Sequence, residues 1–304
     1  MTTPNRATLI NKTHKVLKRS YKHNPLKADQ PLFESLLFAC CLENTRHDLA
    51  QEAFAKVRAA FFDWNEIRVS TVKELAEVLD ILPEPSEAGT RLKGILQSVF
   101  ESDYSFDLEH LKKQNIGAAV KRLQKLHGAT PFGVAYATQA ALGGHSIPVD
   151  KGALGALYVL GVMSEAEAKD GVVPGMERAI PKSKGQEFGA LLHELGADFF
   201  ANPFSTPLRE LLLSISADAR DRFPKRAPKK PVAPPAPAPS KVAAADGKKK
   251  EAVGAKKPAK GSEKHGGSEK RGAHSAKAAA HPKKKPTGAT KKTAVKSLAK
   301  RKPR

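Results

Sequence analysis

Along the first two thirds of the chain, apolar residues recur with the period of amphipathic helices that bury one face. The broad apolar face of LFESLLFACCL, residues 32–42, predicts a buried helix. No stretch shows the period-two alternation of a half-buried strand. We therefore predict an all-α fold of about nine to eleven helices. The other main predicted helices span residues 7–19, 48–62, 71–79, 87–102, 107–113, 116–125, 151–160, 185–195 and 208–219.

Polar residues at fixed spacing predict where several helices begin. Thr71 with Glu74 and Ser164 with Glu167 have the spacing of a capping box, and Thr206-Pro207 has the sequence of an N-cap followed by an N1 proline. Breaks are predicted at 63–68 and 81–85, and a loop at 171–184. The aromatic residues Phe61, Phe62 and Trp64 are interpreted as core.

Charge divides the chain into two parts. The formal net charge is +21, and residues 225–304 hold 25 Lys and Arg against four acidic residues. Residues 1–224 hold 27 basic and 27 acidic residues, so all the net charge lies in the C-terminal segment. Any affinity of the helical part for DNA must then come from local geometry rather than from overall charge.

The C-terminal segment, residues 224–304, consists mainly of Lys, Ala, Pro, Gly and Ser. It has no aromatic residue after Phe223, so we expect it to be disordered. Its composition resembles the tails of linker histones, which implies sequence-independent binding of DNA phosphates. The binding of other polyanions, including RNA, remains the alternative. The basic clusters are Lys248, Lys249, Lys250, Lys283, Lys284 and Lys285.

Cysteine usage and hydropathy limit the compartment. The only cysteines, Cys40 and Cys41, are adjacent, so a disulfide between them could not cross-link distant parts of the fold. This cysteine usage fits a reducing compartment. No apolar run approaches the roughly 18 residues of a membrane span, and the N-terminus shows no secretory signal. We expect a monomer without a membrane partner that is cytoplasmic and nucleoid-associated, or nuclear in a eukaryote.

A turn between two predicted helices carries the most informative motif. Leu126-His127-Gly128-Ala129-Thr130 resembles the hairpin of a helix-hairpin-helix DNA-binding motif, whose backbone N–H groups bind phosphates. Gly128 keeps one glycine of that hairpin, and Thr130 replaces the second. Thr130-Pro131 favours the start of a helix, but Pro131 removes one possible phosphate donor. An ordinary turn between two helices is the alternative interpretation.

Asp150 follows the hairpin at a distance that extends the resemblance. Together with Pro148-Val149, it is similar to the catalytic aspartate segment of the endonuclease III superfamily of base-excision DNA glycosylases. In that family the aspartate stabilises the oxocarbenium-like sugar and activates the nucleophile. Bifunctional members place a lysine 18 residues earlier, where this chain has Phe132. The resemblance therefore implies no Schiff-base lyase activity, and a structural role for Asp150 as an N-cap remains the alternative.

Two further comparisons with the family concern base flipping and the cofactor. Asn44 and Thr45 match the polar end of the helix that fills the gap left by a flipped base, although they are equally the end of an ordinary helix. The four cluster-binding cysteines of many members are missing from residues 193–213, so no iron–sulfur cluster is expected. Phe199, Phe200 and Phe204 are expected to pack there instead.

The resemblance and the composition give one preferred interpretation. We expect an N-terminal arm at 1–28, a two-lobed glycosylase domain at 29–223 and a DNA-binding tail at 224–304. The preferred function is a monofunctional DNA N-glycosylase with water activated by Asp150 and DNA contacts at Gly128, Ala129, Thr130, Asn44, Thr45 and the tail lysines. The alternative is an inactive glycosylase fold in a DNA-binding or chromatin-associated protein. An RNA-binding protein is disfavoured because no aromatic platform is visible.

Overall fold

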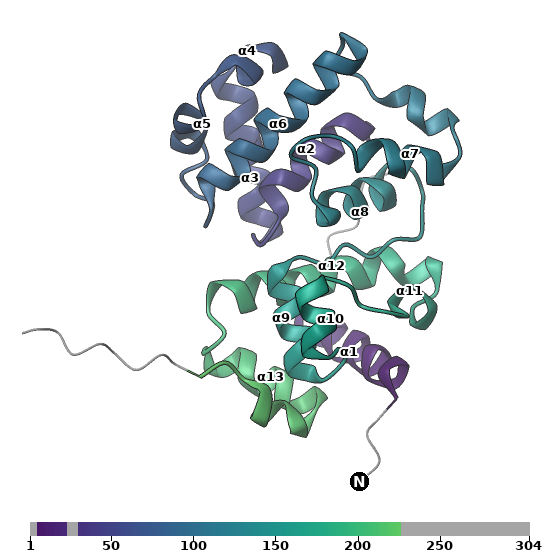
Figure 1. Ribbon diagram of the computed structural model, residues 1–304. Helices are drawn as coiled ribbons and strands as arrows, with labels where there is room; N and C mark the ends of the chain where they lie inside the picture. Colours follow the sequence, from purple (N-terminus) through teal and green to yellow (C-terminus); the bar gives the residue numbers. More distant parts are fainter. Residues whose placement is uncertain (1–4, 23–29, 226–304) are drawn as a thin grey trace, which may run out of the picture. The chain divides into compact units, whose positions relative to one another are not determined.

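The computed structural model describes residues 5–22 and 30–225. Within these ranges every regular element is a helix, as the hydrophobic pattern predicts. The helices form two groups with separate hydrophobic cores (Figure 1). We call α2 to α8 the first lobe, and α1 with α9 to α13 the second lobe.

The first lobe is built around α2, Leu32–Leu42, which is buried on nearly all sides because almost every residue is apolar. Thr71 and Glu74 form the predicted capping box at the start of α5. The remaining elements are α3 His47–Ala60, α4 Trp64–Val69, α5 Val72–Val78, α6 Pro85–Asp103, the 3-10 helix η1 Glu109–Lys113, α7 Ile116–Leu123 and α8 Pro131–Ala140.

Two predictions for the first lobe were wrong. The expected break at 63–68 is the short helix α4, because the Asp63 side chain caps the Glu66 N–H. Phe62 is not a core residue, since 96% of it is exposed, whereas Phe61 and Trp64 are partly buried against the core. Helix α6 also begins earlier than expected, because Pro85 occupies its first turn.

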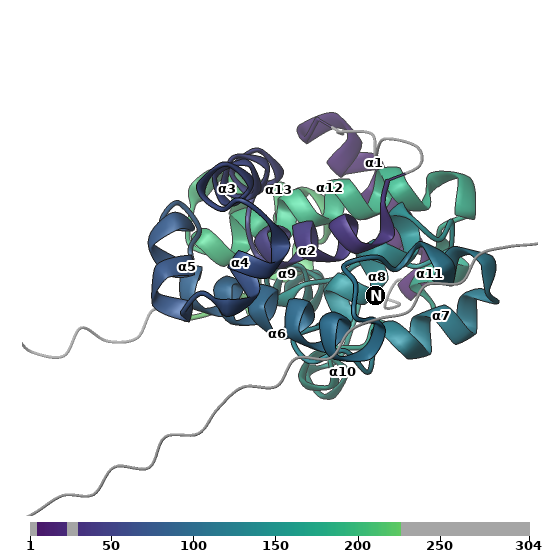
Figure 2. The ribbon, with the colours of Figure 1, turned by 90° about the horizontal axis from the view of Figure 1, so that it is seen from above.

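The second lobe is assembled from both ends of the described chain. It contains α1 Arg6–Ser20, α9 Lys151–Leu160, α10 Glu165–Asp170, α11 Met176–Ala179, α12 Lys182–Ala201, α13 Thr206–Ile215 and the 3-10 helix η2 Ala217–Arg222. Helix α1 packs against α12 (Figure 2) and places Leu9, Ile10 and Leu17 in this core. Residues 6–20 therefore differ from the separate N-terminal arm expected from the sequence.

Other boundaries in the second lobe also differ from expectation. Helix α12 is 20 residues long, and α11 lies inside the expected loop at 171–184. Ser205 is the N-cap of α13 in place of Thr206, whereas the capping box of Ser164 and Glu167 is confirmed. The described residues contain 13 α-helices and two 3-10 helices, more than the predicted number, because short one- and two-turn helices leave little periodic pattern.

Helices α9 and α12 approach each other very closely at a pair of glycines. A Cβ on Gly152 would lie 2.0 Å from the carbonyl oxygen of Gly196, and one on Gly196 would lie 2.8 Å from Asp150 Oδ1. The absence of both side chains lets α12 lie directly beside the first turn of α9. This contact brings the residues of α12 to Asp150.

Within the described ranges, none of the helices has the length and apolar character that crossing a membrane requires.

Candidate functional site

The predicted hairpin is present between α7 and α8. The Ala129 N–H donates to the Leu126 carbonyl at 3.1 Å, and Gly128 adopts φ +88°. A Cβ on Gly128 would also lie 2.6 Å from the backbone oxygen of Arg91, so this glycine is required by both conformation and space. The structure thus gives a physical reason for the one glycine that the motif retains.

The end of the hairpin is joined to a buried carboxylate. The Thr130 hydroxyl accepts from the Gly133 N–H at 3.0 Å and donates to Glu43 Oε2 at 2.8 Å. Burial raises the pKa of Glu43, while Arg91 and the Thr130 hydroxyl act in the opposite direction. Glu43 therefore places negative charge beside the N-terminus of α8, where a phosphate would bind in the family hairpin. A phosphate at this helix N-terminus would therefore meet the repulsion of Glu43 as well as the loss of the donor at Pro131.

Asp150 is the N-cap of α9, as its position in the sequence indicates. Its Oδ1 accepts from the Ala153 N–H at 2.8 Å, and its Oδ2 accepts from the Asn44 N–H at 3.3 Å. His193 Nδ1 lies 3.0 Å from the same Oδ2, and the Asp150 side chain is 0% exposed. Protein groups thus occupy both carboxylate oxygens, and water does not reach them in this arrangement.

His193 on α12 is the residue of this site that the sequence did not reveal. It lies 43 positions after Asp150, and the packing of α9 against α12, closest at Gly152 and Gly196, brings the two together. Its Nε2 is 2.7 Å from the Thr45 carbonyl oxygen. Burial lowers the pKa of His193, but Asp150 and the Thr45 carbonyl outweigh this effect, so the pKa lies above its ordinary value.

Asn44 and Thr45 lie beside Asp150, but both are buried. Asn44 has a left-handed backbone at φ +62°, which asparagine tolerates better than most residues. Its Oδ1 accepts from the Gly152 N–H at 3.4 Å, and its Nδ2 donates to Glu84 Oε2 at 3.5 Å. Only 2% of Asn44 and 3% of Thr45 are exposed. In this structure, therefore, they join the two lobes and do not project toward a duplex.

Phe132 occupies the position where the family's bifunctional members have lysine. Its ring is 2% exposed and stacks on Tyr136, with the ring centroids 6.3 Å apart. The centroid of the His193 ring lies 5.5 Å from that of Phe132. An aromatic cluster therefore fills the place of the nucleophile, and the cluster supplies no amine for covalent attack.

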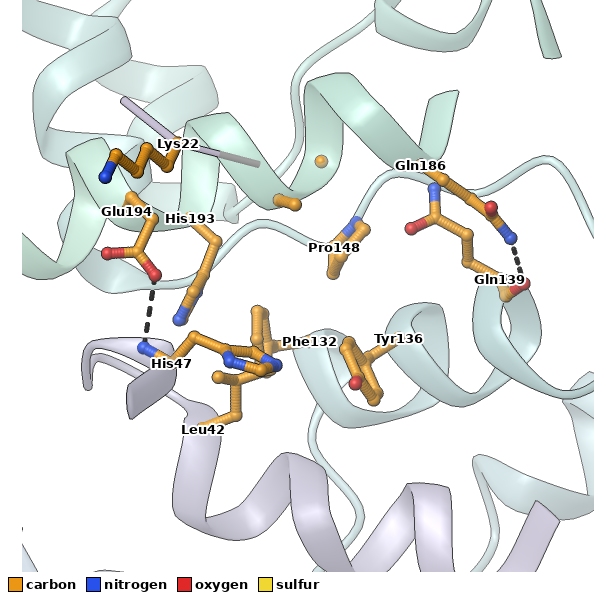
Figure 3. A pocket seen from close by; sticks show the side chains of 12 residues that line it. Lys22, Leu42, His47, Phe132, Tyr136, Gln139, Pro148, Gln186, His193 and Glu194 are labelled. Atoms are coloured by element: carbon orange, nitrogen blue, oxygen red, sulfur yellow. Dashed lines mark hydrogen bonds between the residues drawn. The ribbon is translucent and has the colours of Figure 1, made fainter. Parts of the chain in front are cut away.

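A small cavity lies between the lobes beside this cluster (Figure 3). Its volume is about 30 Å³, which is room for one or two water molecules and far less than a flipped base needs. Residues that surround it include Leu42, His47, Phe132 and Tyr136 of the first lobe and Pro148, Gln186, His193 and Glu194 of the second.

Figure 3 shows two of the hydrogen bonds that cross between the lobes near this cavity. The His47 N–H donates to Glu194 Oε1 at 3.1 Å, and Gln186 Nε2 donates to the Gln139 carbonyl at 3.5 Å. A nucleobase could enter only if the contacts between the lobes were broken. The cavity is therefore a closed site in this arrangement.

The described residues contain no group of three or more His, Cys, Asp or Glu side chains arranged to hold a metal ion. Burial raises the pKa of the Cys41 thiol to about 12 and also raises that of Cys40, so both stay protonated thiols within α2. Phe199 and Phe200 pack against α9 at Gly155 and Gly152. Aromatic side chains thus cover α9 in the region where the family resemblance places a cluster.

The tail lysines at 248–250 and 283–285 lie outside the described residues. Their expected contacts with DNA remain a prediction from composition. The described residues of the expected interface, Gly128, Ala129 and Thr130, lie together in the hairpin, whereas Asn44 and Thr45 lie at the contact between the lobes.

Comparison with known proteins gives matches in structure alone. Neither a scan against protein-family models nor a search of curated protein sequences gave a match. The structure is similar to endonuclease III in a non-covalent complex with DNA, with a TM-score of 0.50 and 14% identity over 72% of this chain and 99% of that one.

Two other solved structures are more distant. One is a thermostable thymine-DNA glycosylase, with a TM-score of 0.45 and 14% identity over 63% of this chain and 85% of that one. The other is a 3-methyladenine DNA glycosylase of H. pylori, with a TM-score of 0.41 and 16% identity over 65% of this chain and 96% of that one. The likeness to endonuclease III, together with the hairpin and the two all-helical lobes, shows that the chain has the helix-hairpin-helix fold of the endonuclease III type.

Proposed function

We propose that this protein binds DNA and acts as a monofunctional DNA N-glycosylase of base-excision repair. The observation that carries the proposal is the position of Asp150 in an endonuclease III fold, where it caps α9 and contacts His193, which lines the cavity between the lobes. A carboxylate at this place stabilises the positive charge that develops on the sugar as the base leaves. It also orients and deprotonates the water that adds to C1′.

Phe132 supports hydrolysis rather than lyase chemistry. A Schiff base requires an amine at the sugar, and the aromatic cluster around Phe132 provides none. The product is then an abasic site whose strand stays intact until alkali cleaves it. No borohydride-trapped adduct should form with the wild-type protein.

The buried state of Asp150 adds a condition to this function. Because its side chain is 0% exposed, a substrate reaches it only after the contacts with Asn44 and His193 separate. Binding of DNA with a flipped base would have to supply the free energy for this opening. The closed arrangement is then the resting state of the enzyme.

A second candidate is a glycosylase fold that binds DNA without catalysis. The complete burial of Asp150 favours it, and so does the charge of the helical domain. Residues 29–224 hold 20 basic and 27 acidic residues, whereas residues 225–304 carry the net positive charge. In this candidate the tail supplies the affinity for DNA, and Asp150 serves only as an N-cap and a contact between the lobes.

One experiment separates the two candidates. The full chain is incubated with duplexes that contain uracil, an oxidised pyrimidine, an alkylated purine or a mismatch, and each reaction is then treated with hot alkali. Alkali-dependent cleavage that disappears in Asp150→Asn supports the glycosylase. Binding of every duplex without cleavage supports the binding protein. Circular dichroism of Asp150→Asn shows whether its helices are retained.

A further inference from the structure

Several of the polar contacts between the two lobes gather on the short segment that follows α2. Asn44 donates its N–H to Asp150, and its side chain accepts from the Gly152 N–H. The Thr45 carbonyl faces His193 Nε2, and Arg46 donates to Asp198 Oδ1 at 3.1 Å. Every one of these contacts must break if the lobes are to separate at the cavity.

His193 is at the centre of this segment's contacts, and its surroundings fix where its protons lie. The Thr45 carbonyl only accepts, so Nε2, at 2.7 Å, carries a hydrogen. Nδ1 faces Asp150 Oδ2 at 3.0 Å, and two lone pairs at that distance would repel each other. Pairing with the Asp150 carboxylate at this distance therefore favours a second proton on Nδ1, although Nδ1 lacks the geometry of a hydrogen bond.

We propose that His193 is a positioning residue that holds Asp150 through this ion pair and thereby keeps the two lobes closed. In the proposed glycosylase, these contacts must break before a substrate reaches Asp150. Only this consequence for catalysis rests on the proposed function. We call the set Asn44, Thr45, Asp150 and His193 the interlobe latch.

Loss of the proton from His193 opens the latch. With Nε2–H still bonded to Thr45, deprotonation leaves the Nδ1 lone pair against the Asp150 carboxylate in a dry site, where repulsion is strong. Separation of the lobes then relieves the repulsion and exposes the Asp150 side chain. Protonation has the opposite effect and keeps the carboxylate paired.

Other titratable groups beside His193 shift its pKa, and that of its neighbour His47, in both directions. Glu194 raises the pKa of His193, and Asp150 raises it more strongly. Burial lowers the pKa of His47, with Glu194 raising it and His193 lowering it further. Arg46 partly offsets the charge of Glu194 at a distance of 3.9 Å. Because closure raises the pKa of His193 above 6.5, the latch is fully formed below that pH and is lost as pH rises through the raised value.

Hydrogen exchange of the Asn44 and Gly152 amides on the full chain tests the latch without any substrate, because both N–H groups donate within it. After correction for the intrinsic chemical rate, their protection in the wild type should fall between pH 6 and pH 9. The fall should reach about tenfold for every unit by which closure raises the pKa of His193. In His193→Gln the protection should no longer vary with pH in this window.

His145→Gln is the matched control. His145 Nε2 also faces backbone carbonyls, those of Glu177 and Ile180, but both belong to the second lobe. This variant should keep the wild-type pH dependence at Asn44 and Gly152. Flat protection in the wild type, or an equal slope in His193→Gln, would overturn the latch.

A second measurement applies if His193→Gln does not fold. Carbon-13 NMR of the histidine rings should show one ring in the wild type that titrates above 6.5 and shifts to lower pH in Asp150→Asn. Absence of such a ring contradicts the proposal. A pH-dependent latch in a protein that excises no base would refute the proposed function alone, whereas base excision without the latch would refute this inference alone.

Discussion

The Glu43 carboxylate accepts a hydrogen bond of 2.8 Å from the Thr130 hydroxyl and joins the end of α2 to the N-cap of α8. Arg91 Nη1 lies 3.9 Å from the same carboxylate and also contacts Glu87 at 3.5 Å. A polar network thus connects the hairpin to the end of α2 and to α6, and the stability of the hairpin depends on these contacts.

Replacement of Glu43 by glutamine should change how stability depends on pH. The pKa of Glu43 is raised by burial above 4.5, so the folded protein binds the proton more readily than the unfolded chain. The free energy of unfolding therefore falls as pH rises from about 4.5 through the raised pKa. Glutamine still accepts from Thr130 but does not ionise, so this decline should be absent in urea unfolding of Glu43→Gln between pH 4 and pH 7. If the free energy of unfolding of Glu43→Gln declined as much as that of the wild type, other groups would be its cause.

Thr130→Val should destabilise the hairpin. Valine keeps the shape of the side chain but loses both the cap to Gly133 and the hydrogen bond to Glu43. Loss of an N-cap costs about 0.5–2 kcal/mol, and the unpaired Glu43 adds to this cost. Thr130→Ser retains the hydroxyl and should remain near wild-type stability. Thermal unfolding of both variants decides the matter, and equal midpoints would contradict this role of Thr130.

Gly152→Ala should separate α9 from α12. The new Cβ would lie 2.0 Å from the Gly196 carbonyl oxygen, so the helices must move apart. Such overpacking costs about 1–3 kcal/mol or more. Gly133→Ala in α8 is the matched control, since its Cβ would meet nothing closer than 3.4 Å and alanine favours helices. Urea unfolding should show a loss only for Gly152→Ala, together with faster hydrogen exchange at Ala153.

Truncation after Pro224 should weaken the salt dependence of DNA binding. The removed segment holds 25 basic residues against four acidic ones. If roughly ten of them meet phosphates, the slope of log K against log salt is about −9 in the full chain and much shallower in the truncated protein. Fluorescence anisotropy over a series of salt concentrations measures both slopes. Equal slopes would place the phosphate contacts in the helical domain instead.

The sequence by itself determined the class of fold and much of the local structure. Helical spacing of apolar residues predicted an all-α protein, and the capping boxes at Thr71 and Ser164 were confirmed because such signals depend only on neighbouring residues. The hairpin with Gly128 and the N-cap at Asp150 could be predicted for the same reason, because they also depend on neighbouring residues. Phe132 could be excluded as a nucleophile from its side chain alone.

Only the tertiary structure decided the surroundings of Asp150. His193 meets it because two glycines on different helices allow α9 and α12 to touch, and no local pattern encodes a pairing over 43 residues. The burial of Asn44 and the pairing of Glu43 with Thr130 likewise depend on how helices pack. Side-chain chemistry follows from the sequence, but the access of water to a side chain and the pKa of that side chain are set by the packing around it.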